Sequence, residues 1–227
     1  MYPEGHVFEN FKGNVLDHFL SIGWYRMGAG LFTTRSINPF QNEISSPVYW
    51  LRYLVDNVKL SKKNRELITR NSRFTYQYKA FNLTEEVVEL HRLYTENLKF
   101  TTSGSLVTLL EDLYNQVFDS IIIEVRDEGK LIAAGIFDLG SQSIAGIINF
   151  YNPEYKKYSP GKFLILLKYY FCVKNKLPWY YPGYYTPGHP IFDYKLFLDK
   201  NATEVFLPDD KSWIPYHKFV ALNTLQP

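Results

Sequence analysis

Basic side chains are concentrated in one segment of this 227-residue chain, between residues 62 and 73. Lys62, Lys63, Arg65 and Arg70 all lie there. Lysine and arginine neutralise backbone phosphates, so the segment is a candidate contact for a nucleic acid, and the alternative is a solvent-exposed helix face. Because the formal net charge of the chain is only +2, any contact with a nucleic acid must be local.

A second candidate for binding is the tetrapeptide Ser159-Pro160-Gly161-Lys162, which has the sequence of a helix start. Ser159 is a suitable N-cap and Pro160 suits the first helical position, so we predict a helix that runs to about Lys174. Backbone N–H groups at such a start can hold an anion. Pro160 has no N–H to donate, which leaves fewer donors than at an ordinary helix start.

Aromatic residues are unusually frequent, with 19 Tyr, 17 Phe and 4 Trp. Runs such as 169–171 and 179–181 suit the wall of a polar pocket or a base-stacking surface, and the alternative is partly buried helix and strand faces. The five histidines show no metal-ligand spacing, so no metal site is predicted. The single cysteine, Cys172, lies mid-helix among aromatic residues, where we expect a buried and inert thiol.

Nothing in the sequence indicates export or a membrane. One cysteine cannot form an internal disulfide framework. The first ten residues lack a basic stretch followed by an apolar one, and no apolar run approaches the ~20 residues that span a bilayer. We therefore expect a cytoplasmic protein that does not bind a membrane.

Local patterns predict alternating elements in the first half of the chain. The first 60 residues are rich in aromatic and turn residues and indicate short strands and loops. After them, Ser61 and Thr84 are suitable N-caps, and Glu85 and Glu86 follow Thr84 where the helix dipole favours negative charge. The expected elements are strands over 48–58 and 73–81 and helices over 62–71, from 85 onward and over 104–117.

Strand patterns dominate the second half. Three alternating segments over 120–126, 130–139 and 143–151, joined by short turns, predict an antiparallel meander. The helix from Ser159, a strand over 179–184 and a loose tail follow. This order resembles the acyltransferase fold of the N-acetyltransferase (GNAT) superfamily. We therefore expect an α+β fold, with a GNAT-like domain over residues 73–227 and a packed β-rich segment over residues 1–72.

Six short matches, in order along residues 20–213, resemble the aminoacyl-tRNA–protein transferase family, the arginyltransferases and leucyltransferases of the N-end rule pathway. They are GWYRMG at 23–28, the basic helix at 62–71, the strand at 131–138, FYNP at 150–153, SPGK at 159–162 and LPWYYPGYY at 177–185 followed by Tyr194-Lys195. The family's cysteine cluster is expected within and before residues 38–47. That stretch contains no cysteine, so a thiolate metal or redox site is excluded there.

The resemblance implies transfer of an amino acid, most often arginine, from aminoacyl-tRNA to the N-terminal amine of an acceptor protein, with no other cofactor. Such a reaction needs positioning, a neutral amine and a donor for the developing oxyanion. An α-amine has a pKa near ~8, so a weak base suffices. The resemblance gives the catalytic candidates Asp138, Tyr184, Tyr185, Tyr194 and Lys195. It gives the substrate-binding candidates Arg26, Lys62, Lys63, Arg65, Arg70, Asn71, Tyr151, Ser159, Gly161 and Lys162.

Two other functions are compatible with the same fold. An acyl-CoA-dependent N-acyltransferase would show a cleft for phosphopantetheine between two splayed strands. Acetyl-CoA enzymes of the superfamily carry two or more glycines in the loop before the helix, whereas Gly161 here stands alone after Pro160. The other function is that of a non-enzymatic relative that binds tRNA or a peptide, and a basic groove without the cleft would favour tRNA.

Overall fold

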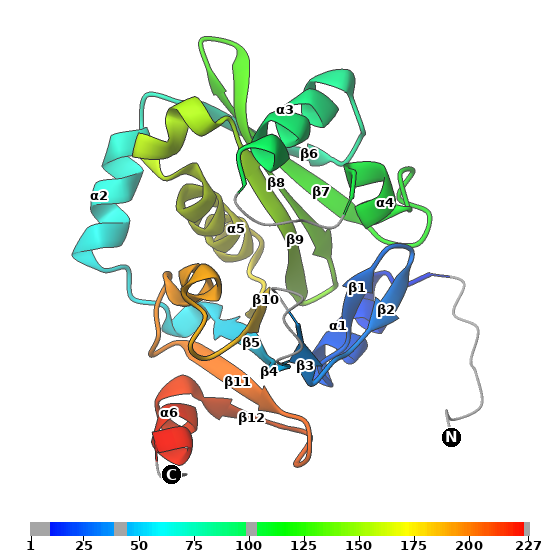
Figure 1. The fold of residues 1–227 in the computed structure, drawn as a ribbon, viewed down its shortest axis with the longest axis vertical. Coiled ribbons are helices and arrows are strands. Elements are labelled where there is room, and N and C mark those ends of the chain that lie inside the picture. Colours follow the sequence, from blue (N-terminus) through cyan, green and yellow to red (C-terminus); the bar gives the residue numbers. More distant parts are fainter. Residues whose placement is uncertain (1–9, 39–44, 99–103, 225–227) are drawn as a thin grey trace.

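A computed structural model describes residues 10–38, 45–98 and 104–224 of the chain. In these ranges one large mixed sheet has the strand order β12-β11-β5-β10-β9-β8-β7-β6 (Figure 1). Its strands are β5 (Tyr49–Leu54), β6 (Thr75–Ala80), β7 (Ser120–Asp127), β8 (Lys130–Leu139), β9 (Ser143–Tyr151), β10 (Trp179–Tyr185), β11 (Thr203–Leu207) and β12 (Ser212–Pro215). The predicted antiparallel meander is confirmed as β7-β8-β9.

Helices cover both faces of this sheet. On β7, Ile123 and Val125 share a buried cluster with residues of α5 (Pro160–Asn175), whereas Ile122 packs with residues of α3 (Glu85–Glu96). Side chains alternate between the two faces of a strand, so α5 and α3 lie on opposite faces. The α+β expectation is confirmed, and residues near the middle of the sheet are enclosed from both sides.

Two of the three predicted N-caps, Ser61 and Thr84, are confirmed by their side-chain hydrogen bonds, whereas Ser159 makes none. The Ser61 side chain accepts the N–H of Asn64 at the start of α2 (Lys62–Asn71), and the Asn64 side chain accepts the N–H of Ser61, which completes a capping box. Thr84 accepts the N–H of Val87 at 3.3 Å at the start of α3. These short-range hydrogen bonds depend on neighbouring residues, so the sequence alone predicted them.

The predicted helix over 104–117 is wrong in length. Only α4 (Leu106–Leu110) forms, because Glu111 adopts a φ of 54°, which ends the helix. The chain then turns around the Asp112 carboxylate, which accepts the N–H groups of Gln116, Val117 and Phe118 at 2.8 to 2.9 Å. A buried carboxylate that satisfies three backbone donors competes with helix continuation.

The loose tail predicted for the last dozen residues is also wrong. Residues 216–224 form α6 (Tyr216–Thr224), and Phe219 is buried against Tyr49 of β5. The N-terminal segment likewise holds a helix, α1 (Gly13–Ser21), besides the hairpin β1 (Tyr25–Met27)–β2 (Gly30–Phe32) and the pair β3 (Ser36–Ile37)–β4 (Ser46–Pro47). Three 3₁₀ turns complete the described elements: η1 (Val55–Asn57), η2 (Pro153–Tyr158) and η3 (Pro190–Leu196).

The N-terminal segment contributes β5 to the middle of the sheet, between β10 and β11. A domain boundary at residue 72 stays a prediction. The expected position of the missing cysteine cluster overlaps residues 39–44, and His6 falls in residues 1–9; these lie outside the described residues. No helix in the described ranges is long and apolar enough to cross a membrane.

Candidate functional site

The two strands at the centre of the sheet, β9 and β10, run parallel and then part. Their pairing covers only three positions, from Trp179 opposite Ser143 to Tyr181 opposite Ala145. The next residue of β10, Pro182, has no N–H for the ladder, and Gly183 follows with a φ of 99° in a β-bulge. β10 therefore continues alongside β5 while β9 continues alongside β8, and a gap opens between them.

A cavity of about 170 Å³ occupies this gap. Its walls combine aromatic and aliphatic surface with three basic side chains, and no carboxylate is among the described residues that line it. The wall contains Tyr25, Arg26, Phe32, Trp50, Leu109, Gly146, Ile147, Ile148, Asn149, Ile165, Lys168, Tyr180, Pro182, Gly183, Tyr184, Tyr194 and Lys195. The cavity is partly open to solvent, and its lining is mainly apolar with a few polar groups, which is the usual character of a small-molecule site.

The cavity reaches both faces of the sheet. Ile165 and Tyr180 belong to the buried cluster on the α5 face, whereas Tyr25 and Trp50 belong to a different cluster formed with α1 and the β1–β2 hairpin. All four line the cavity. The cavity therefore borders the packed layers on both sides of the sheet.

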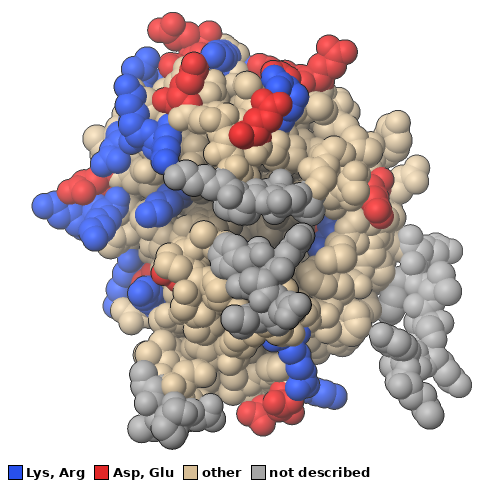
Figure 2. Space-filling view, viewed as in Figure 1, with Lys and Arg blue, Asp and Glu red and all other residues tan. Residues whose placement is uncertain are grey.

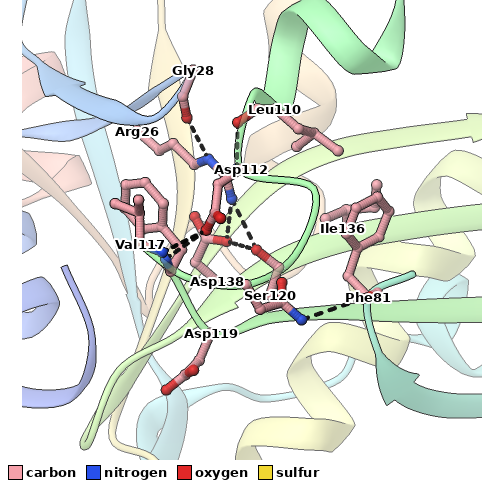
Figure 3. Close-up of polar contacts among 12 residues, drawn as sticks. Arg26, Gly28, Phe81, Leu110, Asp112, Val117, Asp119, Ser120, Ile136 and Asp138 are labelled. Atoms are coloured by element: carbon pink, nitrogen blue, oxygen red, sulfur yellow. Dashed lines mark hydrogen bonds and ion pairs between the residues drawn. The ribbon is translucent and has the colours of Figure 1, made fainter. Parts of the chain in front are cut away.

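Arg26 enters the cavity wall from β1 and is held by buried partners (Figure 3). Its Nη1 donates to Asp138 Oδ1 and to Ser120 Oγ, both at 2.9 Å, and its Nη2 donates to the carbonyl oxygen of Leu110 at 2.6 Å. The guanidinium also lies 4.3 Å from the centroid of the Phe118 ring. These contacts fix the orientation of one cation at the cavity wall.

Asp138, predicted to be catalytic, lies behind Arg26 and does not line the cavity. Its side chain is 0% exposed, and Oδ2 has no hydrogen-bond partner among the described residues. Burial raises the pKa of Asp138 above its ordinary value, and Arg26 and Ser120 offset part of that effect. The geometry indicates that Asp138 positions Arg26.

Lys168 of α5 is a cavity residue that sequence reasoning missed. It is 1% exposed, and its Nζ donates to the carbonyl oxygens of Ile136 at 2.8 Å and Ile148 at 3.4 Å. Burial lowers the pKa of Lys168 to about 7, and Asp138 opposes this shift. The available signal was a single charge within the apolar run FLILLKYYFC of α5.

Lys195 lines the same cavity from η3. Its Nζ donates to the carbonyl oxygen of Tyr184 at 2.9 Å and lies 4.4 Å from the centroid of the Tyr184 ring. The residue as a whole is half-buried, and the burial of its amine lowers the pKa of Lys195 to about 7. An amine with this pKa can take up and release a proton near neutral pH.

The structure brings four of the predicted residues together at the cavity: Arg26, Tyr184, Tyr194 and Lys195. Tyr185 points away and packs with α6, 6.0 Å from Tyr216 between ring centroids. Tyr151 lies at the other end of β9, with its ring 5.2 Å from that of Tyr94. Neither Tyr185 nor Tyr151 lines the cavity.

The predicted basic helix forms an exposed surface. Figure 2 shows Lys and Arg side chains gathered at upper left, on the side of the molecule that carries α2. The exposed basic residues of α2 and the turn after it, of η2 and of the start of α5 form what we call the basic surface: Lys62, Lys63, Arg65, Arg70, Arg73, Lys156, Lys157 and Lys162. Asn71 is buried instead, and its Nδ2 donates to the carbonyl oxygens of Leu67 and Tyr158.

The start of α5 offers few donors for an anion. Ser159 caps the helix in a left-handed conformation and makes no side-chain cap hydrogen bond. The N–H groups of Lys162 and Phe163 both donate to the Ser159 carbonyl oxygen, and Pro160 has none. Gly161 alone retains a free N–H in this first turn, which fits a pyrophosphate poorly. Among the described residues no group of three His, Cys, Asp or Glu could hold a metal ion.

Solved structures confirm the fold class. FemX has a TM-score of 0.52 with this chain at 8% identity, over 85% of this chain and 66% of FemX. Likeness at this level concerns the fold alone. The mixed sheet, the parted strands β9 and β10 and the covering helix α5 place the protein among the GNAT-like acyltransferase folds.

The chain belongs to the arginine-tRNA-protein transferase family, since the family model for the C terminus of these enzymes matches residues 69–202, more than half of the chain. The aspartate/glutamate leucyltransferase of Leptospira interrogans is 24% identical over 217 residues, 93% of this chain and 82% of the relative. The enzyme of the same name from Campylobacter jejuni is 25% identical over 198 residues, 85% of this chain and 80% of the relative. The resemblance to aminoacyl-tRNA–protein transferases is confirmed.

Proposed function

We propose that this protein transfers leucine from leucyl-tRNA to the N-terminal amine of proteins that begin with Asp or Glu. The observation that carries the proposal is the cavity between β9 and β10, where Arg26, Lys168 and Lys195 meet an aromatic wall. The names of the relatives from Leptospira interrogans and Campylobacter jejuni support leucine as the donor and acidic acceptors. A cytoplasmic location stays a prediction.

The lining of the cavity supports leucine over the arginine that the sequence resemblance favoured. A guanidinium enters a buried site with a carboxylate partner, and no described lining residue supplies one. The leucine side chain needs only apolar surface, which Phe32, Leu109 and Ile147 provide. Three basic side chains in the wall also repel a cationic substrate and attract an anionic one.

The reaction needs little covalent help from the protein. The neutral α-amine of the acceptor attacks the ester carbonyl carbon, so a C–N bond forms while the C–O bond to the terminal ribose breaks. The ribose oxygen leaves with the proton that the amine loses. We assign the neutral form of Lys195 as the group that takes this proton and passes it on, and Arg26 as the donor to the oxyanion.

The basic surface is the proposed contact for the tRNA. Lys63, Arg70 and Lys157 are exposed, and no ion pair within the described chain engages them. Unpaired cations on a protein surface strengthen binding to a nucleic acid, because they neutralise backbone phosphates and release the counterions held there. The family match supports charged tRNA as a partner, and we assign its backbone to this surface because its cations are exposed and clustered.

The experiment is transfer of radiolabelled leucine or arginine from charged tRNA to peptides that begin with Asp, Glu, Asn or Lys. We expect label on the Asp and Glu peptides from leucyl-tRNA and none from arginyl-tRNA. Uncharged tRNA with free leucine serves as the control, since it lacks the activated ester. Transfer from arginyl-tRNA alone would overturn leucine as the donor.

A second candidate is N-acyl transfer from acyl-CoA, which the gap between β9 and β10 favours because a phosphopantetheine arm would fit between splayed strands. The start of α5 opposes it, since Gly161 alone offers a free N–H there. Radiolabelled acetyl-CoA is therefore run in parallel with the charged tRNAs. Label from acetyl-CoA and none from either tRNA would select this candidate.

A further inference from the structure

Lys168 is a buried amine for which the described chain supplies no salt bridge. Among the described residues its Nζ donates hydrogen bonds to the carbonyl oxygens of Ile136 and Ile148, and the Asp138 carboxylate acts on it through space only. Removing an ammonium from water without a counterion is costly, and an apolar residue of similar volume would pack at the same place. Buried titratable groups of this kind cluster at functional sites, and Lys168 lines a cavity in which it can bind a substrate group.

The surroundings of Lys168 leave room for one small anionic group. Lys168 and Gly146 line the cavity together, and a Cβ added at Gly146 would lie 3.6 Å from Lys168 Nζ. The absence of that Cβ leaves space beside the amine and the Tyr180 ring. Trp50 also lines the cavity and is 4% exposed, and its indole Nε1 is buried with no hydrogen-bond partner among the described residues. Two buried donors in one small cavity are suited to a carboxylate.

We propose that Lys168, assisted by the Trp50 indole N–H, binds the side-chain carboxylate of the first residue of the acceptor protein. This inference rests on the proposed function and names the residues that select an acidic N-terminus. Lys168 is fully buried in the cavity wall, whereas Lys195 is half-buried, and both line the same cavity. In this proposal the acceptor side chain lies at Lys168 and its α-amine at Lys195, where the proton must be removed.

Apart from Lys168 and Lys195, no described side chain in the cavity wall is assigned a change of charge near neutral pH. Tyr25, Tyr180, Tyr184 and Tyr194 line the cavity and have pKa values raised by burial, and Arg26 is held by Asp138 behind the wall. Cys172, one turn after Lys168 on α5, is buried and also has a raised pKa. Lys168 and Lys195 are thus the described groups at the cavity that titrate near pH 7.

The test compares peptides that begin with Asp and with Asn, which differ in charge and hardly in size. We expect Lys168→Met to lower kcat/KM for the Asp peptide by ~10- to 100-fold, the effect of one hydrogen bond to a charged group, and to leave the Asn peptide within ~3-fold. Lys174→Met, an exposed lysine of the same helix, is the matched control and should change neither value.

Two further readouts separate charge recognition from loss of folding. Gly146→Ala keeps Lys168 and places a methyl group against its amine, so it should also lower the Asp-to-Asn preference. In the wild-type protein KM for the Asp peptide should rise above pH 7, where the free lysine loses its proton, and KM for the Asn peptide should not follow. Equal losses for both peptides in Lys168→Met, or no loss for either, would overturn the inference.

Calorimetric binding of the two peptides without tRNA distinguishes this inference from the proposed function. If the wild-type protein transfers no leucine and still binds the Asp peptide more tightly than the Asn peptide through Lys168, the proposed function fails and the inference stands. If transfer to Asp peptides occurs and Lys168→Met keeps the wild-type preference, the inference fails and the function stands.

Discussion

Arg26 and Asp138 lie 112 positions apart in the sequence and form an ion pair of 2.9 Å between Nη1 and Oδ1, with side chains 1% and 0% exposed. The pair joins the β1–β2 hairpin to the end of β8. It makes the orientation of a cavity residue depend on a residue that cannot touch the substrate. Substitution of either partner should therefore lower both the free energy of unfolding and the transfer activity.

The first prediction is a double-mutant cycle on this pair. Asp138→Leu leaves a buried guanidinium unpaired and Arg26→Met leaves a buried carboxylate unpaired, so each should lower the free energy of unfolding by about 3–5 kcal/mol. The double variant should lose less than either single variant, since no charge remains unpaired. Urea unfolding measures all three. Loss of the exposed pair Arg35–Asp209 in a control variant should have no measurable effect, and additive losses at Arg26 and Asp138 would contradict the coupling.

Local signals predicted most of the sheet and its helices. The caps at Ser61 and Thr84 and the three strands of the meander depend on residues close in sequence, and they formed as expected. The helix expected over 104–117 failed because the Asp112 carboxylate offers the following backbone N–H groups a better arrangement than a helix.

The candidate site was only partly predictable. Short motifs placed Arg26, Tyr184, Tyr194 and Lys195 near the reaction centre, and all four line the cavity. Lys168 was missed because α5 is buried on most of its surface, so its apolar pattern does not mark which side faces a cavity. Short motifs also did not show that Asp138 lies behind Arg26, because that arrangement depends on packing between residues far apart in the sequence.

The second prediction concerns the dependence of stability on pH. Lys168 has a folded-state pKa lowered to about 7, below the unfolded value near ~10.4. Between these values the unfolded chain binds a proton that the folded one does not, so the Lys168 contribution to stability rises with pH, by ~1.4 kcal/mol per unit. Below pH 7 both states are protonated and the contribution is constant.

Lys168→Met removes this titration. The unfolding free energy of wild type minus that of Lys168→Met should therefore increase by ~2–3 kcal/mol from pH 7 to pH 9, and stay flat from pH 5 to pH 6. Urea unfolding at each pH measures it, with Lys174→Met as the control that shows no such trend. A difference that is constant over the whole range would contradict a buried, titrating amine.

The third prediction tests the basic surface through salt. Lys63→Ala/Arg70→Ala/Lys157→Ala should weaken binding of leucyl-tRNA and reduce the slope of log K against log salt by about 2 to 3, since up to three phosphate contacts are lost. Filter binding between 50 and 200 mM salt, about the range over which such effects are large, measures it. Lys174→Ala/Lys211→Ala/Lys218→Ala removes the same charge from exposed positions at the end of α5, in the turn before β12 and in α6, and should leave the slope unchanged. Equal effects from the two triple variants would show that only net charge matters.

The last prediction tests the bulge that parts the two central strands. Gly183 has a φ of 99°, and a Cβ there would lie 3.3 Å from Lys195 Nζ, so Gly183→Ala both strains the backbone and presses on a cavity residue. Gly129, in the turn between β7 and β8, has a φ of 88° and no atom within 4 Å of an added Cβ. Gly129→Ala therefore carries the backbone strain alone. Both variants should be destabilised by ~1–3 kcal/mol in urea unfolding. Only Gly183→Ala should also lower kcat for leucine transfer, because it displaces the amine that takes the proton, and equal kcat values in the two variants would remove Lys195 from the reaction.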